Sequence, residues 1–204
     1  MKNEYLAIIL DDNKGVKAII KPNSYKFGFK LMEHSYIANP FVRAVEILLI
    51  NEYKGYSLVW CSLKSTNMDI DKIIDNIINH ENVIAPKIDN SFGARHYMPN
   101  DKNYLINYSK KEYIYLFPFY LESNRYFNDK DIKQESVIVH PLPLLCCDSH
   151  NEFDYNGKHK GLMGRWAFDK IGIVNSKELP SDFVEIKVDF KIPIREDLHY
   201  HKSY

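Results

Sequence analysis

Two stretches of the chain alternate strictly between apolar and polar residues, and this period of two constrains the fold more than any other feature. They span Ser24–Leu31 and Phe183–Ile192. The apolar positions are Tyr25, Phe27, Phe29 and Leu31 in the first stretch and Val184, Ile186, Val188, Phe190 and Ile192 in the second. The opposite face of the second stretch carries Glu185, Lys187, Asp189 and Lys191. Because successive side chains of a strand point to opposite faces of a sheet, both stretches predict half-buried strands.

Shorter β-rich runs predict further strands. A hairpin is expected at Tyr5–Leu10 and Val16–Lys21, around a turn that ends at Gly15. A second hairpin is expected at Tyr104–Asn107 and Tyr113–Phe117. The remaining predicted strands are Tyr56–Cys61, Val137–Val139 and Arg165–Val174.

Apolar residues at helical spacing predict two helices. Asn39 is the expected N-cap of the first helix, with Pro40 at its first position and Gly55 as its stop. Regularly spaced isoleucines predict the second helix over Asp69–His80. Phe119–Phe127 fits either a helix or coil. Together the elements predict an α+β fold, with a mostly antiparallel sheet of about eight strands and two main helices, in one globular domain over residues 1–204.

Composition excludes several classes of protein. Lys and Arg together number 27, as do Asp and Glu, so the formal charge is zero and a dedicated nucleic-acid-binding protein is not expected. The 3 cysteines form no disulfide framework, which favours a reducing, cytoplasmic compartment. No signal peptide and no run of about 20 apolar residues is present, so we expect a soluble protein with no membrane partner. The 15 Tyr and 11 Phe suit half-exposed sheets and interfaces.

The most site-like feature is the predicted strand-to-helix junction Leu31–Pro40. A helix N-terminus presents free N–H groups and a partial positive charge, so it suits a carboxylate or a phosphate. A histidine beside it adds a donor, or a general acid or base near neutral pH. The candidate ligand-binding residues are His34, Ser35, Asn39 and Arg43.

A structural role for the same residues competes with ligand binding. Neighbouring side chains of a strand diverge, so Glu33, His34 and Ser35 do not form a catalytic triad through their proximity in sequence. In this alternative, His34 holds the loop through hydrogen bonds to the backbone and Asn39 only caps the helix.

A second candidate site is the segment from His140 to His159, whose composition suits a soft metal. It holds His140, Cys146, Cys147, Asp148, His150, Asp154 and His159. The spacing does not match the paired ligands of structural zinc sites, and buried structural thiols explain the cysteines at least as well. We therefore expect no metal and no cofactor. The glycine-spaced basic stretch Gly157–Arg165 is expected to be a solvated turn, because no helix follows it to bind a phosphate.

Several segments resemble a known family. Lys30–Tyr36 has the sequence KLMEHSY, and Asn39, Phe41 and Val42 follow it. Further similar segments, in the same order, are Val59-Trp60, Lys110–Tyr113, Leu142–Leu145 and Gly164–Asp169. Together they resemble an uncharacterised single-domain protein family of phage and bacterial mobile-element genomes. Because that family has no established activity, the resemblance implies a single domain and a mobile-element context, but no mechanism.

The chain departs from that family at three places. Cys61–Lys64 replaces an acidic Gly-Asp-Tyr stretch, Asn107-Tyr108 replaces Asn-His, and Cys146–His150 takes the place of a glycine-rich loop. If the acid and the histidine act in chemistry in relatives, the resemblance implies that this chain has lost that chemistry.

Three hypotheses of function remain, and the sequence leaves open whether the protein is an enzyme. The leading hypothesis is an accessory protein that binds a partner protein or a small anionic ligand at the junction 31–43. The competing hypothesis is a hydrolase or transferase that uses His34 as general acid or base with Glu33 or Asp169. The third is an interaction module that uses a tyrosine-rich sheet as its interface.

Overall fold

The structure is a computed structural model, and it describes residues 4–25, 30–37, 39–62, 84–85, 103–128, 136–148, 155 and 157–193. The strands are β1 (Tyr5–Leu10), β2 (Val16–Ile20), β3 (Tyr56–Ser62), β4 (Tyr104–Asn107), β5 (Glu112–Tyr115), β6 (Ser136–Ile138), β7 (Lys170–Val174), β8 (Val184–Glu185) and β9 (Lys191–Pro193). The α-helices are α1 (Leu31–His34), α2 (Pro40–Ile50), α5 (Phe117–Asn128) and α6 (Pro141–Cys146). The 3-10 helices are η1 (Pro22–Tyr25) and η3 (Lys160–Leu162).

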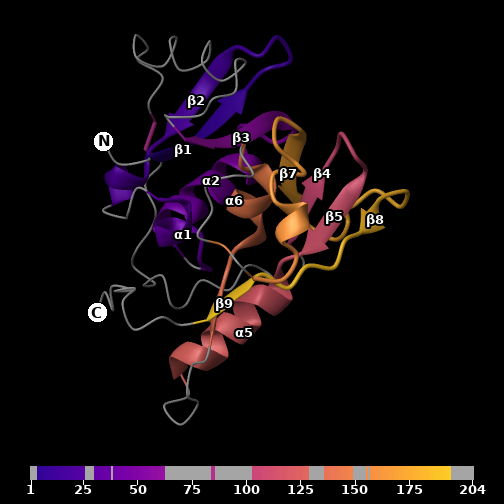
Figure 1. Ribbon diagram of the computed structural model, residues 1–204. Helices are drawn as coiled ribbons and strands as arrows, with labels where there is room; N and C mark the ends of the chain where they lie inside the picture. The colour runs from indigo at the N-terminus through magenta and orange to yellow at the C-terminus, as the bar shows by residue number, and fades with distance from the viewer. Residues whose placement is uncertain are drawn as a thin grey trace.

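Within the described residues, seven strands form one sheet in the order β2-β1-β3-β7-β4-β5-β8 (Figure 1). Neighbouring strands are antiparallel except β5 and β8, which run parallel. Strands β6 and β9 form a separate antiparallel pair. The predicted α+β class is therefore confirmed, with one correction: the main sheet is mixed and has seven strands.

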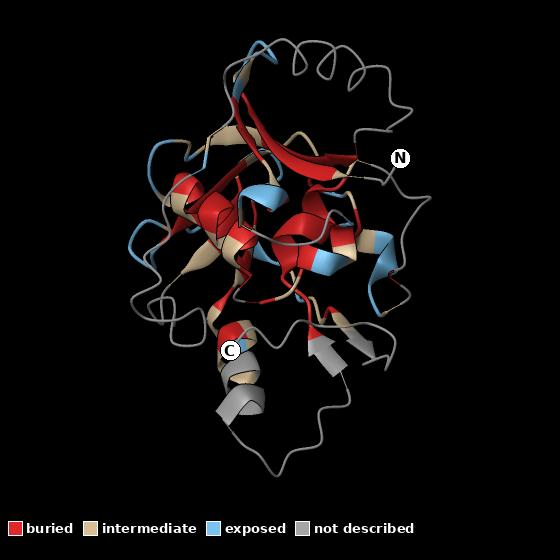
Figure 2. Ribbon diagram, turned by 90° about the vertical axis from the view of Figure 1, so that its left-hand side faces the viewer, coloured by how far each residue is buried: buried red, intermediate tan, exposed pale blue. Residues whose placement is uncertain are grey.

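The core lies on both faces of the first strands of the sheet. Residues Tyr5, Ala7 and Ile9 of β1 belong to the main core, whereas Leu6, Ile8 and Leu10 belong to a second buried cluster on the other face. Helix α2 packs against β2 and β7, and helix α6 packs against β3. Figure 2 shows that the buried residues of these strands and helices gather in the middle of the molecule.

The predicted strand Ser24–Leu31 is wrong wherever the structure describes it. Ser24 lies in η1, and Leu31 begins α1, while residues 26–29 lie outside the described residues. Local capping explains the helix, because the Lys30 N–H donates to Oε2 of Glu33 over 3.1 Å. The junction Leu31–Pro40 therefore joins two helices, and not a strand to a helix.

The alternating stretch Phe183–Ile192 is a strand only at its two ends. The chain pairs first with β5, through Ile186 N–H to the Tyr113 carbonyl, and then with β6, through Val139 N–H to the Phe190 carbonyl. Because the partner changes, residues 186–190 are not a regular strand, and β8 and β9 belong to different sheets. The predicted strand Arg165–Val174 likewise begins only at Lys170, after turns at residues 165–169.

Other predictions of secondary structure are confirmed. The β1–β2 and β4–β5 hairpins, strand β3 and the start of α2 at Pro40 are all present. Phe119–Phe127, which fitted helix or coil, lies in α5. The predicted helix Asp69–His80 falls outside the described residues. Among the described helices, none is long and apolar enough to cross a membrane.

Candidate functional site

His34 ends helix α1 and has no exposed surface. Its Nε2 accepts a hydrogen bond from Nε1 of Trp60 over 3.0 Å. Because an indole nitrogen can only donate, this imidazole nitrogen must carry a lone pair. The ring also meets Phe41 edge-on, with the ring centroids 4.8 Å apart. His34 therefore joins α1 to β3 and α2 inside the core.

Ser35 and Asn39 bond to the backbone of the junction itself. The Ser35 hydroxyl donates to the Leu31 carbonyl over 2.6 Å. Oδ1 of Asn39 accepts from the N–H groups of Phe41 over 2.8 Å and Val42 over 3.4 Å, so Asn39 is the N-cap of α2 as predicted. Because these two N–H groups donate to the cap, they are not free for an anion, and both side chains are buried.

Arg43 belongs to a polar network in the core that the sequence did not predict. Its guanidinium donates to Oε2 of Glu46 over 3.1 Å, and its side chain is 14% exposed. The buried Glu46 carboxylate also accepts from the Tyr120 hydroxyl over 2.8 Å and lies 3.0 Å from Nε2 of His140. The network therefore joins α2, α5 and the start of α6. The signal for this network in the sequence was Glu46, a glutamate among the apolar residues of α2.

The protonation of this network follows from its contacts. Nδ1 of His140 accepts the Leu142 N–H over 3.1 Å and caps α6, so Nε2 carries the proton and donates to Glu46. Burial raises the pKa of Glu46, but the hydrogen bond from His140, the charge of Arg43 and the Tyr120 hydroxyl outweigh it and lower the pKa. Glu46 is consequently an ionised carboxylate held in the core.

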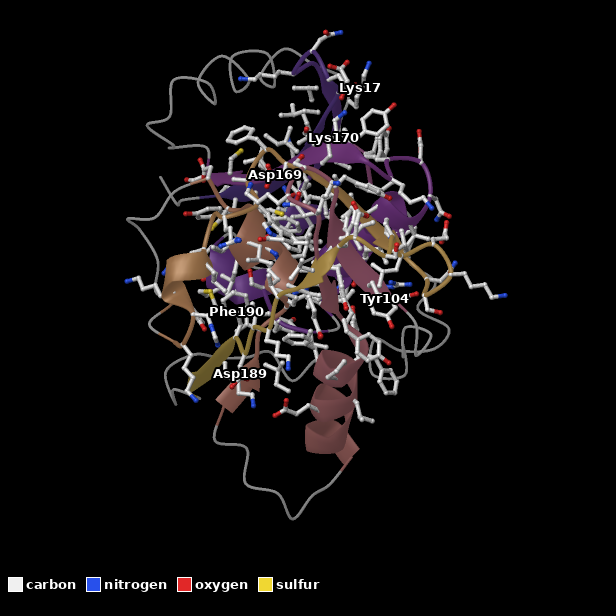
Figure 3. The ribbon with its side chains drawn as sticks, turned by 90° about the vertical axis from the view of Figure 1, so that its right-hand side faces the viewer. Lys17, Tyr104, Asp169, Lys170, Asp189 and Phe190 are labelled. Atoms are coloured by element: carbon white, nitrogen blue, oxygen red, sulfur yellow. The ribbon has the colours of Figure 1, made fainter. Side chains whose placement is uncertain are left out.

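The carboxylates of the enzyme hypothesis bond to other groups. The Glu33 side chain accepts the Lys30 N–H, and Oδ2 of Asp169 accepts from Nδ2 of Asn107 over 2.7 Å. Asp169 lies just before β7, on the upper part of the view in Figure 3. The enzyme hypothesis further requires that His34 face a substrate, whereas its ring is buried. A role of His34 as acid or base stays a prediction without geometric support.

The segment from His140 to His159 is divided between different surroundings. The thiols of Cys146 and Cys147 are buried, and burial raises the pKa of Cys147 to about 12. His159 lies on an exposed turn with a φ of 61°. His150 and Asp154 lie outside the described residues. In the part of the chain that the structure describes, no group of three or more His, Cys, Asp or Glu side chains is placed to hold a metal ion.

The glycine-spaced stretch Gly157–Arg165 consists of turns and η3 and ends in an ion pair between the exposed Arg165 and the buried Glu112. Both oxygens of Glu112 accept from the Arg165 guanidinium, and Oε2 also accepts from Nε1 of Trp166 over 2.8 Å. Burial raises the pKa of Glu112, but Arg165 and Trp166 outweigh it and lower the pKa. Because Arg165 and Trp166 both donate to Glu112 of β5, these hydrogen bonds hold the turn against β5.

One face of β4 and β5 carries an array of half-buried aromatic side chains, here called the aromatic face. Its members are Tyr104, Tyr108, Tyr113, Tyr115, Phe117 and Phe183. The Tyr104 ring stacks on Tyr115 with centroids 5.0 Å apart and meets Tyr113 edge-on at 5.6 Å. Tyr115 stacks on Phe117 at 6.1 Å. Figure 3 views the molecule from the side of β4, β5 and β8 and labels Tyr104 there.

The aromatic face is a tyrosine-rich sheet surface of the kind named in the interaction hypothesis, with rings that are half-buried. Along β5 the residues facing the core, Ile114 and Leu116, alternate with Tyr113 and Tyr115 on the outer side. The alternation and the high tyrosine content were the signals in the sequence. The side of the sheet that carries the aromatic rings could be assigned only from the strand pairing in the structure.

No protein-family model, curated protein or solved structure matches the chain. The phage or mobile-element context therefore stays a prediction from the resemblance. What the protein does is accordingly inferred from the contacts, burial and charges of the described residues.

Proposed function

We propose that the protein is a binding protein whose aromatic face recognises a partner protein. The observation that carries this proposal is the contact of Tyr104 with both Tyr113 and Tyr115 on the outer side of the sheet. Tyrosine is enriched at protein interfaces because its ring buries a large apolar area while its hydroxyl keeps a polar partner. This proposal follows the third hypothesis from the sequence, an interaction module with a tyrosine-rich sheet, and not the leading hypothesis of a site at the junction 31–43.

The ring contacts favour binding because they hold the side chains in place before a partner arrives. Immobilising a flexible side chain at an interface costs about 0.5–1.5 kcal/mol. Tyr115 already packs between Tyr104 and Phe117, so its ring loses little freedom on binding. A rigid aromatic surface of this kind provides anchors of the sort that dominate the binding energy of many interfaces.

The charges around the aromatic face favour a protein over single-stranded nucleic acid. Stacking platforms for nucleic acid need free cations along the phosphate backbone. Here Lys54 pairs with Glu178 over 2.7 Å, and Lys111 pairs with Asp182 over 2.7 Å. These two lysines are neutralised within the chain, and the carboxylate of Glu185 lies beside Tyr113. Charges of both signs therefore surround the rings, as is usual for a protein interface.

Binding of a small anion at the junction 31–43 stays a second possibility that the contacts support less. His34, Ser35 and Asn39 are buried, and each forms a hydrogen bond with another part of the junction or core. A ligand there would have to displace the Asn39 cap from Phe41. The hydrolase or transferase alternative would need the same region to open.

Site-specific photocrosslinking in cells that produce the full chain tests the proposal. A benzophenone amino acid is placed at Tyr113 or Tyr115, and at Tyr25 as the control, which is also half-buried but packs on Phe41. We expect one and the same partner protein to crosslink from positions 113 and 115 and not from 25. Crosslinks of equal pattern from all three positions, or none from the aromatic face, would contradict the proposal.

A further inference from the structure

Strand β8 is the last strand at one edge of the main sheet, and within the described residues no further strand pairs with it. Among the described residues, Val184 at this edge is the one large apolar side chain that is exposed, at 65%. At the opposite edge, the Ile84 N–H donates to the Ile19 carbonyl over 3.0 Å, which covers part of β2. An open strand edge is a template for pairing with another strand.

The backbone groups that face this edge can be assigned from the pairing with β5. The N–H groups of Val184 and Ile186 donate inward, each over 2.9 Å, to the carbonyls of Lys111 and Tyr113. Because backbone groups alternate in direction along a strand, those of Glu185 point outward. Beyond β8 the Ile186 N–H still donates to β5, and the same alternation, continued past Ile186, points the groups of Lys187 outward as well. Within the described chain no hydrogen bond reaches these outward groups.

The side chains at the same two positions carry opposite charges. Glu185 and Lys187 are exposed, and neither forms an ion pair within the described part of the chain. Glu185 lies beside Tyr113 in the parallel register, so both charged side chains border the aromatic face. A second strand that pairs antiparallel with this edge can place a positive charge opposite Glu185 and a negative charge opposite Lys187. It does so only if its own charges follow each other in the complementary order.

The chain's own sequence meets this condition. When residues 184–188 are paired antiparallel with the same residues of a second copy about an axis at Ile186, Glu185 of each copy faces Lys187 of the other. The outward backbone groups of the same residues then face each other and form reciprocal hydrogen bonds. Val184 lies across from Val188 of the second copy, so its exposed side chain gains an apolar neighbour.

We propose that the protein forms a symmetric dimer in which residues 184–188, which are β8 and the segment after it, pair antiparallel with the same residues of the second copy, centred on Ile186. The pairing continues the main sheet across the two-fold axis. It also brings the aromatic faces of both copies onto one surface, next to each other. A two-fold interface of this kind uses the same patch on both copies, which a self-complementary strand satisfies.

A register centred on Val188 is the alternative with the same charge complementarity, since it sets Glu185 opposite Lys191 of the second copy. The structure disfavours that register. A Cβ added at Gly157 would lie 2.4 Å from the Lys191 carbonyl oxygen, so the Gly157 segment already covers the outer side of Lys191. The edge is therefore open at Glu185 and Lys187 and covered further along.

Charged side chains on an edge strand also occur as protection against pairing. Charge reversal distinguishes the two roles. The full chain and the variants Glu185→Lys and Lys187→Glu are compared by sedimentation equilibrium from about 1 to 100 μM, a range that detects dimers of micromolar affinity. Glu52→Lys and Lys160→Glu are matched controls, because both residues are exposed and lie away from β8. Circular dichroism verifies that every variant is folded.

We expect the wild type to dimerise and each β8 variant to dimerise at least about tenfold more weakly, because two opposite-charge pairs become like-charge pairs. An equimolar mixture of Glu185→Lys and Lys187→Glu should form heterodimers with wild-type affinity, since each Lys again faces a Glu. Both controls should dimerise as the wild type does. A wild type that stays monomeric, a dimer insensitive to the reversals, or a mixture that fails to recover would each overturn the proposal.

Discussion

The indole Nε1 of Trp60 and the imidazole Nε2 of His34 are joined by a hydrogen bond of 3.0 Å, and both residues are fully buried. The bond connects positions 26 residues apart and fixes α1 against β3. Because it uses the ring nitrogen that a general base would offer to a substrate, His34 acts as part of the core. The surface that we infer to be functional lies on the outer side of β4 and β5.

Replacing His34 should destabilise the fold. His34→Ala leaves the Trp60 N–H without its acceptor, which costs about 1–3 kcal/mol, and opens a cavity beside Phe41. We expect the free energy of unfolding, measured in urea, to fall by about 2–4 kcal/mol in total. The exposed Lys177 is the control, and Lys177→Ala should change the free energy of unfolding by less than about 0.5 kcal/mol. Equal stabilities of the two variants would contradict the structural role of His34.

The buried Glu46 should make stability depend on pH. Its pKa is lower in the folded protein than in the unfolded chain, so the carboxylate stabilises the fold above about pH 4.3, and this contribution is lost as the pH falls through the folded pKa. Glu46→Gln should lower the free energy of unfolding by about 3 kcal/mol at pH 7. Urea unfolding from pH 7 to pH 3 should show this deficit shrinking on acidification. The exposed Glu52→Gln should show no deficit. A deficit that stays constant with pH would contradict the assignment of Glu46 as ionised.

Two glycines of the same turn should respond differently to alanine. At Gly157 a Cβ would lie 2.4 Å from the Lys191 carbonyl oxygen and 2.5 Å from the Tyr155 hydroxyl, whereas at Gly161 nothing lies within 4 Å. Gly157→Ala should therefore cost about 1–3 kcal/mol in thermal or urea unfolding. Gly161→Ala should be neutral or slightly stabilising, because it only restricts the unfolded chain. A larger loss of stability from Gly161→Ala than from Gly157→Ala would show that β9 is not held against Gly157.

The parts of the fold that were predictable depend on local signals. The hairpin turn before Val16 and the cap at Asn39 act over a few residues, and both are present as predicted. The strand Ser24–Leu31 failed because its alternation competes with a second local signal, the cap formed by Lys30 and Glu33. Alternation alone does not show which of two local signals prevails.

The site was less predictable because its contacts span long separations in sequence. Glu46 and His140 lie 94 residues apart, and no spacing rule connects them. The polar residues of the junction lie close together in sequence, but their burial, which favours a role in the core over ligand binding, is a property of the packed fold. A tyrosine-rich sheet surface was predictable in kind, while its position needed the pairing of β4 with β5.

The affinity of the crosslinked partner for a variant without the two central rings tests the binding proposal most directly. Tyr113→Ala with Tyr115→Ala removes the rings that contact Tyr104, and both side chains lie on the outer side of the sheet. Isothermal titration calorimetry with the purified partner should show binding weakened about 100-fold, as for the loss of two anchor residues. Tyr25→Ala should bind as the wild type does. Unchanged affinity of the folded double variant would contradict the assignment of the aromatic face as the binding surface.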